Sequence, residues 1–162
     1  MQFRLKTTVM IAALAMTAGL GAGSALAAGC PEGKGGVDVR APVTTPASGV
    51  TDTVIASVDV AKEPAKIDGR LFRMRKLVIQ PGGVVPWHSH GDRPAIIYIT
   101  KGTLIEYASN CSEPITHSEG DVSTETGGTS HWWKNESNGV AELLSADLFP
   151  VKMMNTAEEH KM

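Results

Sequence analysis

The fold is decided by the stretch Gly82-Gly83-Val84-Val85-Pro86-Trp87-His88-Ser89-His90. Its glycines predict a turn, and residues 84–90 predict a β-strand. Residues two apart in a strand point to the same face, about 6.6 Å apart along the strand. His88 and His90 therefore share an otherwise apolar face, where polar groups need a partner. Two imidazoles at this spacing can bind one metal ion together.

Outward from this stretch, short strand patterns follow one another with turns between them. Runs rich in Val, Ile and Leu alternate with polar residues, and Gly, Pro, Asn or Asp separates the runs. We expect strands over 54–60, 72–79, 84–90, 95–100, 103–107, 122–126, 131–135 and 140–149. A turn is expected at 81–83, and a polar loop around Cys111 and His117. The only expected helix is a frayed tail over 153–162, so the pattern predicts an all-β sandwich or barrel.

A second stretch completes the pattern of a known family. It runs Gly120-Asp121-Val122-Ser123-Thr124-Glu125-Thr126-Gly127-Gly128-Thr129-Ser130-His131-Trp132-Trp133-Lys134-Asn135. The first stretch, continued to Gly102, resembles the first cupin motif, and this stretch resembles the second, with Thr in place of its usual Pro. The resemblance implies a cupin jelly-roll β-barrel over residues 53–150. It also implies that the two histidines of the first motif and His131 bind one divalent metal ion.

The first motif departs from the family in one chemical respect. Its Glu should fall at Pro94 or Ala95, and neither side chain can bind a metal. The expected site is three neutral imidazoles, which leave the ion its full charge and hold it less tightly. Imidazole suits several metals, so iron, manganese, zinc, copper and nickel stay open. Asp92, Glu106 and Glu125 are conceivable replacement ligands, but we expect each to be a solvated surface carboxylate.

Three residues are candidates for a pocket beside the metal. Alternation from His131 turns Trp133 into the barrel and Trp132 outward, so Trp133 is the better pocket wall. Arg93, in the turn after the histidine pair, could clamp a ligand carboxylate. Glu125 could act as a general base, and Asp92 is the alternative for that role.

Other residues near the motifs are expected to take no part in binding. Alternation from Ala95 places Tyr98 outward. His117, in the polar loop, and His160, in the tail, are expected to be bystanders. Asn135 closes the second motif and is expected to shape a turn.

Residues 1–28 have the layout of a secretory signal peptide. Arg4 and Lys6 form a positive start, an uncharged stretch follows, and small residues end the segment. Glycines and a serine dilute the apolar stretch below what a membrane-spanning helix needs. We expect a cleaved signal of bacterial type and a periplasmic or secreted protein. Residues 29–52 are expected to form a flexible arm, and 151–162 a C-terminal tail.

Cys30 and Cys111 are the two cysteines of the chain. After export they favour a disulfide, which would pin the arm to the barrel. The alternative is a lipid anchor on Cys30, since Ala27-Ala28-Gly29 partly resembles a lipoprotein cleavage box. Two unrelated free thiols are the third alternative.

The charge excludes two classes of partner. The formal net charge is −2, and removal of Arg4 and Lys6 with the signal lowers it to −4. No basic stripe remains to bind nucleic acid or an anionic membrane surface. Small-molecule ligands are the expected partners, and the resemblance implies a homodimer.

Three functions stay open for the barrel. It could bind a metal and a small molecule without turnover. It could be a metal-dependent enzyme, either a non-haem oxygenase or a Lewis-acid isomerase or lyase. It could also be a structural cupin whose histidines form a degenerate site. The residues do not decide whether the protein is an enzyme.

Overall fold

Strands make up nearly all regular structure in residues 29–153, the part of the chain that the computed structural model describes. They are β1 (Ser48–Asp59), β2 (Arg70–Ser89), β3 (Ala95–Lys101), β4 (Thr103–Ala108), β5 (Ile115–Ser118), β6 (Val122–Glu125), β7 (Ser130–Lys134) and β8 (Ala141–Pro150). A single 3₁₀ turn, η1 (Val151–Met153), follows within this part. The expected all-β barrel is confirmed. The expected signal peptide and most of the tail lie outside the described residues.

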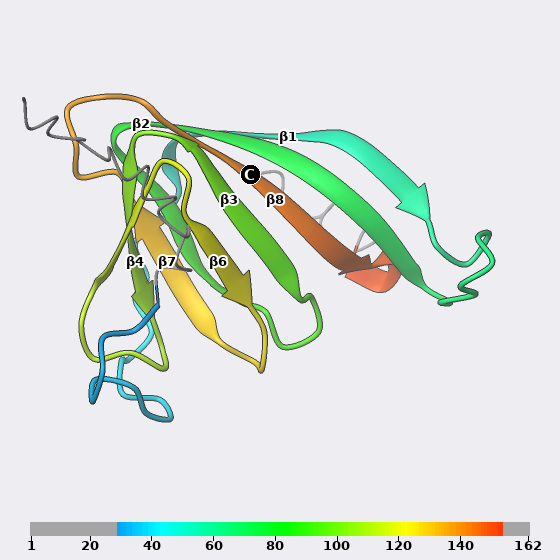
Figure 1. Cartoon of the computed structure of the whole chain (residues 1–162), viewed down its shortest axis with the longest axis horizontal. Coiled ribbons are helices and arrows are strands. Elements are labelled where there is room, and N and C mark those ends of the chain that lie inside the picture. The colour runs from blue at the N-terminus through cyan, green and yellow to red at the C-terminus, as the bar shows by residue number, and fades with distance from the viewer. Residues whose placement is uncertain (1–28, 154–162) are drawn as a thin grey trace, which may run out of the picture.

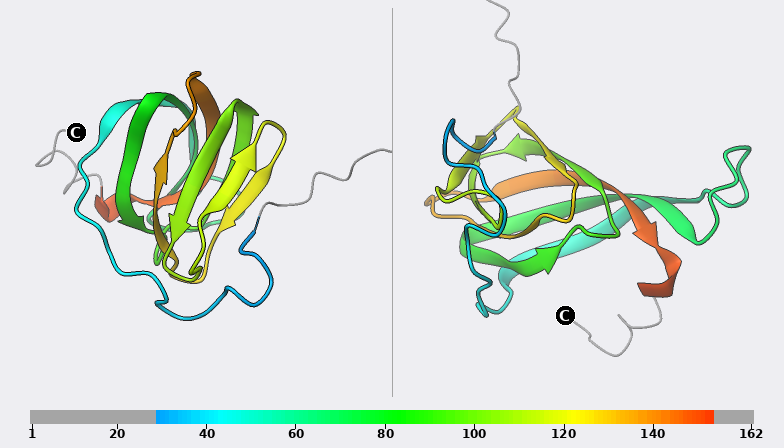
Figure 2. Two further views of the ribbon diagram at one scale, coloured as in Figure 1. Left: turned by 90° about the vertical axis from the view of Figure 1, so that its left-hand side faces the viewer. Right: turned by 90° about the horizontal axis from the view of Figure 1, so that it is seen from below.

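The strands pair antiparallel in the order β5-β4-β7-β2-β8-β3-β6, and β1 pairs with β2. The turn after β5 bonds to β3, which brings the two ends of the sheet together and nearly closes the barrel. In this turn, Gly120 donates to the Ile99 carbonyl at 2.9 Å, and Ile99 donates to the Asp121 carbonyl at 3.0 Å. β1, β2 and β8 continue beyond the barrel as a long ribbon (Figures 1 and 2). Among residues 29–153, no helix has the length and hydropathy to cross a membrane.

β2 is one long strand where the sequence predicted two strands and a turn. Its first half pairs with β8 as far as Ile79 and with β1 as far as Val84, and its second half pairs with β7 from Val84. Gly82 bends the strand with a φ of +74°. At Gly83 a Cβ would lie 2.8 Å from the Gln80 carbonyl oxygen, so only glycine fits. The prediction of a turn at 81–83 is therefore wrong, because the glycines bend the strand without ending it.

Asn135 holds this bend from the other side. Its side-chain amide is buried and donates to the carbonyls of Ile79 at 2.9 Å and Gly139 at 2.8 Å. Its backbone carbonyl accepts from Gly82 at 2.8 Å, and its backbone N–H donates to Gly83 at 3.0 Å. Asn135 shapes the corner of β2 and does not face the histidines.

The first strand begins earlier than the sequence indicated. β1 starts at Ser48, whereas the expected barrel starts at residue 53. Val50 pairs with Ile79 and packs against the core, which draws the last residues of the expected arm into the sheet. The preceding segment follows the barrel end, where Gly36 donates to the Asn110 carbonyl at 3.0 Å. A disulfide joins Cys30 to Cys111.

β5 lies where we expected a polar loop. Its side chains alternate, and Ile115 and His117 are buried while Thr116 and Ser118 are exposed. The sequence hid this alternation because one of its two inward residues is a histidine. The main core of the barrel consists of Leu77, Ile79, Ala95, Ile97, Ile99, Leu104, Trp133, Ala141 and Leu143.

Candidate metal centre

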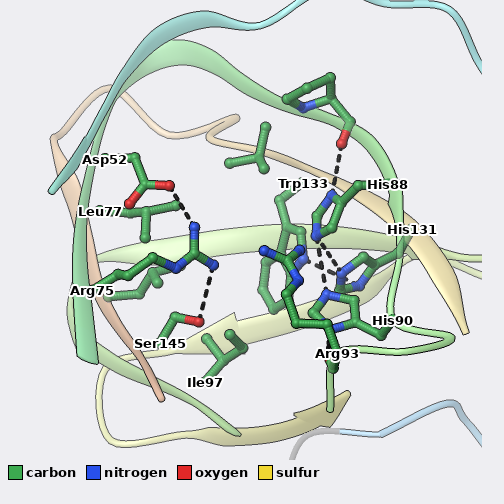
Figure 3. Close-up of a pocket in the computed structure, with 13 residues that line it drawn as sticks. Asp52, Arg75, Leu77, His88, His90, Arg93, Ile97, His131, Trp133 and Ser145 are labelled. Carbon is green, nitrogen blue, oxygen red and sulfur yellow. Dashed lines mark hydrogen bonds and ion pairs between the residues drawn. The ribbon is translucent and has the colours of Figure 1, made fainter. Parts of the chain in front are cut away.

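Three histidines meet inside the barrel at the paired ends of two strands. His88 on β2 lies directly opposite His131 on β7, and His90 follows the end of β2. The Nε2 atom of His88 lies 3.0 Å from Nε2 of His90 and 3.1 Å from Nε2 of His131 (Figure 3). Nitrogens bound at 2.0–2.1 Å to one tetrahedral ion lie about 3.3 Å apart. Both distances are within about 0.3 Å of that separation.

The other ring nitrogen of each histidine has its own acceptor. Nδ1 of His88 donates to the Pro86 carbonyl at 2.9 Å, and Nδ1 of His90 donates to the Arg93 carbonyl at 2.8 Å. Nδ1 of His131 lies 2.6 Å from Oε1 of Glu106. A proton held on Nδ1 leaves the Nε2 lone pair for a metal. The residues therefore fit a divalent metal ion.

Burial keeps two of the imidazoles neutral. Burial, and then the charge of His131, lowers the pKa of His88 to about 3. The same two causes lower the pKa of His90 to about 4. Because a metal binds the neutral imidazole, protons do not compete for these two rings near neutral pH.

Among the described residues, no other carboxylate replaces the missing glutamate beside the three Nε2 atoms. Ala95 is buried at the start of β3, and Glu125 stands opposite it on β6. The Oε2 atom of Glu125 lies 3.3 Å from Nδ1 of His131, on the side of the ring away from Nε2. Within residues 29–153, the group of nearby donor atoms that contains all three histidines contains no carboxylate. The described chain offers an ion three neutral ligands.

A buried polar cluster lies behind His131, formed by residues expected at the surface. Glu106 is 3% exposed, Glu125 2% and His117 0%. The predictions of solvated carboxylates and of a loop histidine are therefore wrong at these positions. Glu106 bridges the two histidines, with Oε1 2.6 Å from Nδ1 of His131 and Oε2 2.8 Å from Nε2 of His117. The alternation of β4 could have placed Glu106 inward, because Leu104 two residues earlier is apolar and buried.

Hydrogen bonds determine the charge on Glu106. Burial acts to raise the pKa of Glu106, but bonds from His117 and His131 outweigh it and lower the pKa. Burial raises the pKa of Glu125. Because an ionised carboxylate can only accept, the short contact places a proton on Nδ1 of His131, which donates it to Oε1 of Glu106. The indole nitrogen of Trp133 lies 3.2 Å from the same Nδ1 atom.

A cavity of about 140 Å³ adjoins the three histidines. Trp133 lines it, and Trp132 faces away and stacks on Tyr107 with ring centroids 4.2 Å apart. Arg93 also lines the cavity. Glu125 does not, since it lines a separate cavity of about 170 Å³ on the other side of His131. The remaining apolar wall is formed by Leu77, Val85, Ile97 and Leu143.

The cavity also contains polar residues that the sequence reasoning missed. Nη1 of Arg75 lies 2.5 Å from Oδ2 of Asp52, and Nη2 donates to the Ser145 hydroxyl at 3.3 Å (Figure 3). Arg75 precedes the inward Leu77 by two residues in β2, so alternation could have found it. Asp52 comes from the expected arm, so only the pairing of β1 brings it to the cavity.

Two expected bystanders lie on the surface. Tyr98 is 44% exposed on β3, as alternation predicted. Asp92 forms ion pairs with Arg70 and Lys152, and its side chain is 39% exposed. It does not bend back toward the histidines.

The chain is similar to one family model and to several solved structures. Residues 75–147 match a family model described as the cupin domain. A predicted oxalate decarboxylase from Thermotoga maritima is 21% identical, with a TM-score of 0.49 over 62% of this chain and 80% of that one. A cupin 2 conserved barrel domain protein from Salinispora arenicola is 16% identical, with a TM-score of 0.49 over 68% and 85%. An oxalate oxidase in complex with glycolate is 19% identical, with a TM-score of 0.48 over 73% and 69%. No curated protein matches the chain.

Proposed function

The barrel of this chain is a cupin domain, and on that premise we propose that the protein is an exported barrel that binds a divalent metal and a small molecule. His88, His90 and His131 hold the ion. The carrying observation is the convergence of three Nε2 atoms beside a cavity, with each Nδ1 bonded elsewhere. When bound, the metal supplies a positive Lewis-acid centre whose charge no ligand offsets.

The residues around the cavity support binding more than turnover. Of the described residues that line it, Asp52 alone carries a carboxylate, and Arg75 holds that carboxylate at 2.5 Å. A general base should have a free acceptor within reach of the reacting group. The buried pair Glu106 and Glu125 lies on the far side of His131 and does not line this cavity. Enzymatic turnover is therefore the second candidate function of the barrel, and the observation that supports it is the cavity beside the metal centre.

Export is part of the proposal. Its support is the charged start and uncharged stretch of residues 1–28, together with the disulfide between Cys30 and Cys111. Disulfides persist in oxidising compartments such as the periplasm. A sulfur joined to Cys111 cannot also carry a thioether lipid, which favours a periplasmic or secreted protein over a lipid anchor on Cys30.

A homodimer through β1 completes the proposal. β1 pairs only with β2 among the described strands, and Val54, Ile55 and Val58 on it are 50%, 53% and 43% exposed. An open, apolar edge strand tends to pair with another strand, and a two-fold axis pairs identical strands antiparallel. Light scattering should give twice the chain mass. Ile55→Lys should restore the single mass, whereas Ile96→Lys, equally exposed on β3, should not.

Metal content tests the central claim. The protein is purified from the compartment to which it is exported, and its metals are measured by plasma mass spectrometry. We expect about one divalent ion per chain, almost none in a His88→Ala/His131→Ala variant, and an unchanged content in His160→Ala. Equal metal in all three proteins, or none in any of them under metal loading, would contradict the proposed centre.

A further inference from the structure

We propose that the cavity beside the three histidines takes a short monocarboxylate, whose carboxylate group is held by Arg93 and Arg75. The proposal deepens the proposed function, because it names the small molecule that the barrel binds. It rests on the arginines and the cavity wall, and the metal centre only adjoins it.

Three guanidinium groups gather around one buried carboxylate. Asp147 is 1% exposed and forms a two-pronged pair with Arg73, at 3.0 Å from Nε and 2.7 Å from Nη2. Arg75 Nε and Arg93 Nη1 each lie 3.6 Å from the same Oδ2 atom. That separation is too long for a hydrogen bond. Asp147 is thus occupied by Arg73, and the other two arginines keep unused donors.

Arg93 has the most unused donors. Its side chain is 15% exposed and reaches into the cavity beside the histidines (Figure 3). Among the residues that the structure describes, its guanidinium makes no hydrogen bond and has only the long ion pair with Asp147. Arg75 is held by Asp52, yet its Nε atom is buried without a hydrogen-bond partner.

In the metal-free protein, the charge balance of the arginine cluster calls for one negative charge. Arg73, Arg75 and Arg93 face Asp52 and Asp147, so three positive charges meet two negative ones. The histidines add no charge when neutral. Guanidinium groups bind carboxylates through paired, charge-assisted hydrogen bonds. A ligand with a single carboxylate would neutralise the excess and use the free donors.

The size and wall of the cavity define the rest of the ligand. A cavity of about 150 Å³ in another protein holds benzene, and this cavity measures about 140 Å³. A ligand of roughly six to eight non-hydrogen atoms therefore fits. Leu77, Ile97 and Leu143 form an aliphatic wall, against which a second charge would be costly. The ligand should carry a short hydrocarbon body on its one carboxylate.

Calorimetric titration of the chelator-treated, metal-free protein tests this proposal with three probes of equal size, because oxalate would otherwise chelate the metal. Butyrate, butanamide and oxalate each have six non-hydrogen atoms, but they carry one, no and two negative charges. We expect butyrate to bind at least tenfold more tightly than either of the others. The expected loss for Arg93→Gln is 10-fold to 100-fold in butyrate affinity, since a hydrogen bond to a charged group is lost. Lys101→Gln, which removes an exposed charge away from the cavity, should bind like the parent.

Further measurements separate this inference from the metal centre. Arg93→Lys keeps the charge and should bind butyrate with intermediate affinity, and thermal melting checks that each variant is folded. Zinc bound normally, with butyrate no better than butanamide or weaker than oxalate, would overturn the ligand class and leave the metal centre standing. Butyrate bound through Arg93 in a protein that takes up no zinc would support the ligand class and overturn the metal centre. If butyrate binds to neither the zinc-loaded nor the zinc-free protein, the proposal is overturned.

Discussion

At the scale of single residues, Glu106 places a negative charge beside Nδ1 of His131. The first motif lacks its own carboxylate, which would have lain on the Nε2 side, where the metal binds. The Glu106 carboxylate bridges Nδ1 of His131 and Nε2 of His117. An acceptor on Nδ1 fixes the ring orientation and makes Nε2 a better ligand. Glu106 is therefore a positioning residue that acts on the metal through His131.

Replacing this carboxylate should weaken metal binding without removing a ligand. For Glu106→Gln we expect a loss of roughly 10-fold to 100-fold in zinc affinity, the range found for such outer partners. Competition with a chromophoric chelator measures the constant. Glu125→Gln is the matched control and should have a smaller effect, because its oxygen lies 3.3 Å from Nδ1, compared with 2.6 Å for Glu106. Equal affinity in the parent and Glu106→Gln would show that the bridge does not tune the centre.

The two neutral histidines predict how the metal-free protein responds to acid. Burial lowers the pKa of His88 to about 3 and that of His90 to about 4. Below pH 6.5, the approximate pKa of histidine in the unfolded chain, the unfolded chain binds protons that the folded chain does not. The free energy of unfolding therefore decreases as the pH is lowered. The fall should continue to about pH 4 for His90 and about pH 3 for His88, at up to about 1.4 kcal/mol per pH unit for each.

Urea unfolding of the chelator-treated protein between pH 7 and pH 4 measures this slope. The His88→Gln/His90→Gln variant should give a flatter profile, because it lacks both titrating groups. Parallel profiles for the parent and the variant would mean that other groups cause the acid sensitivity.

At the scale of elements, the bend in β2 brings the histidines into the barrel. The strand passes from the ladder with β8 to the ladder with β7 between Ile79 and Val84. Bulges and glycines let a strand turn such a corner without losing its pairing. Without the corner, His88 could not stand opposite His131.

The corner has no room for a side chain at Gly83. A Cβ there would lie 2.8 Å from the Gln80 carbonyl oxygen and 2.9 Å from the Gly49 carbonyl oxygen. We expect Gly83→Ala to lower the free energy of unfolding by about 1–3 kcal/mol, the usual cost of overpacking. Gly139→Ala is the control, since nothing lies within 4 Å of a Cβ built there. Urea unfolding curves compare the two, and equal stabilities would contradict the crowding.

At the scale of the whole molecule, the disulfide ties the N-terminal segment to the barrel across 81 residues of sequence. Cys111 is fully buried with Ala108 and Ile115, and Cys30 packs against them. A long loop gives a cross-link a large effect on the unfolded chain. The segment that carries Cys30 leads into β1, whose Asp52 reaches the cavity.

Loss of this bond should destabilise the whole barrel. Cys30→Ser is expected to lower the free energy of unfolding by about 2–5 kcal/mol. Thermal melting with and without a reductant measures the effect. The parent should melt at a lower temperature when reduced, whereas Cys30→Ser should not respond to the reductant. A reductant that leaves the parent unchanged would show that the bond contributes nothing.

Alternation along the chain predicted the fold class, and the resemblance of its two motifs to a known family predicted the histidine set. Alternation predicts strands, and it also turned Trp133 inward. The spacing of the two motifs identified His88, His90 and His131, which the structure brings within hydrogen-bond distance through His88. Motif comparison also revealed the missing carboxylate at Pro94 or Ala95.

The residues that surround those histidines could be identified only from the tertiary structure. Polar residues such as Glu106, Glu125 and His117 are predicted to be exposed when only their neighbours in the sequence are considered. They become buried only when a hydrogen-bond or ion-pair partner is present. Their partners come from other strands, because β5 and β7 both pair with β4. Arg75 and Asp52 likewise meet only because β1 pairs with β2. A charge can be buried only where other strands supply its partner, and that pairing exists only in the folded barrel.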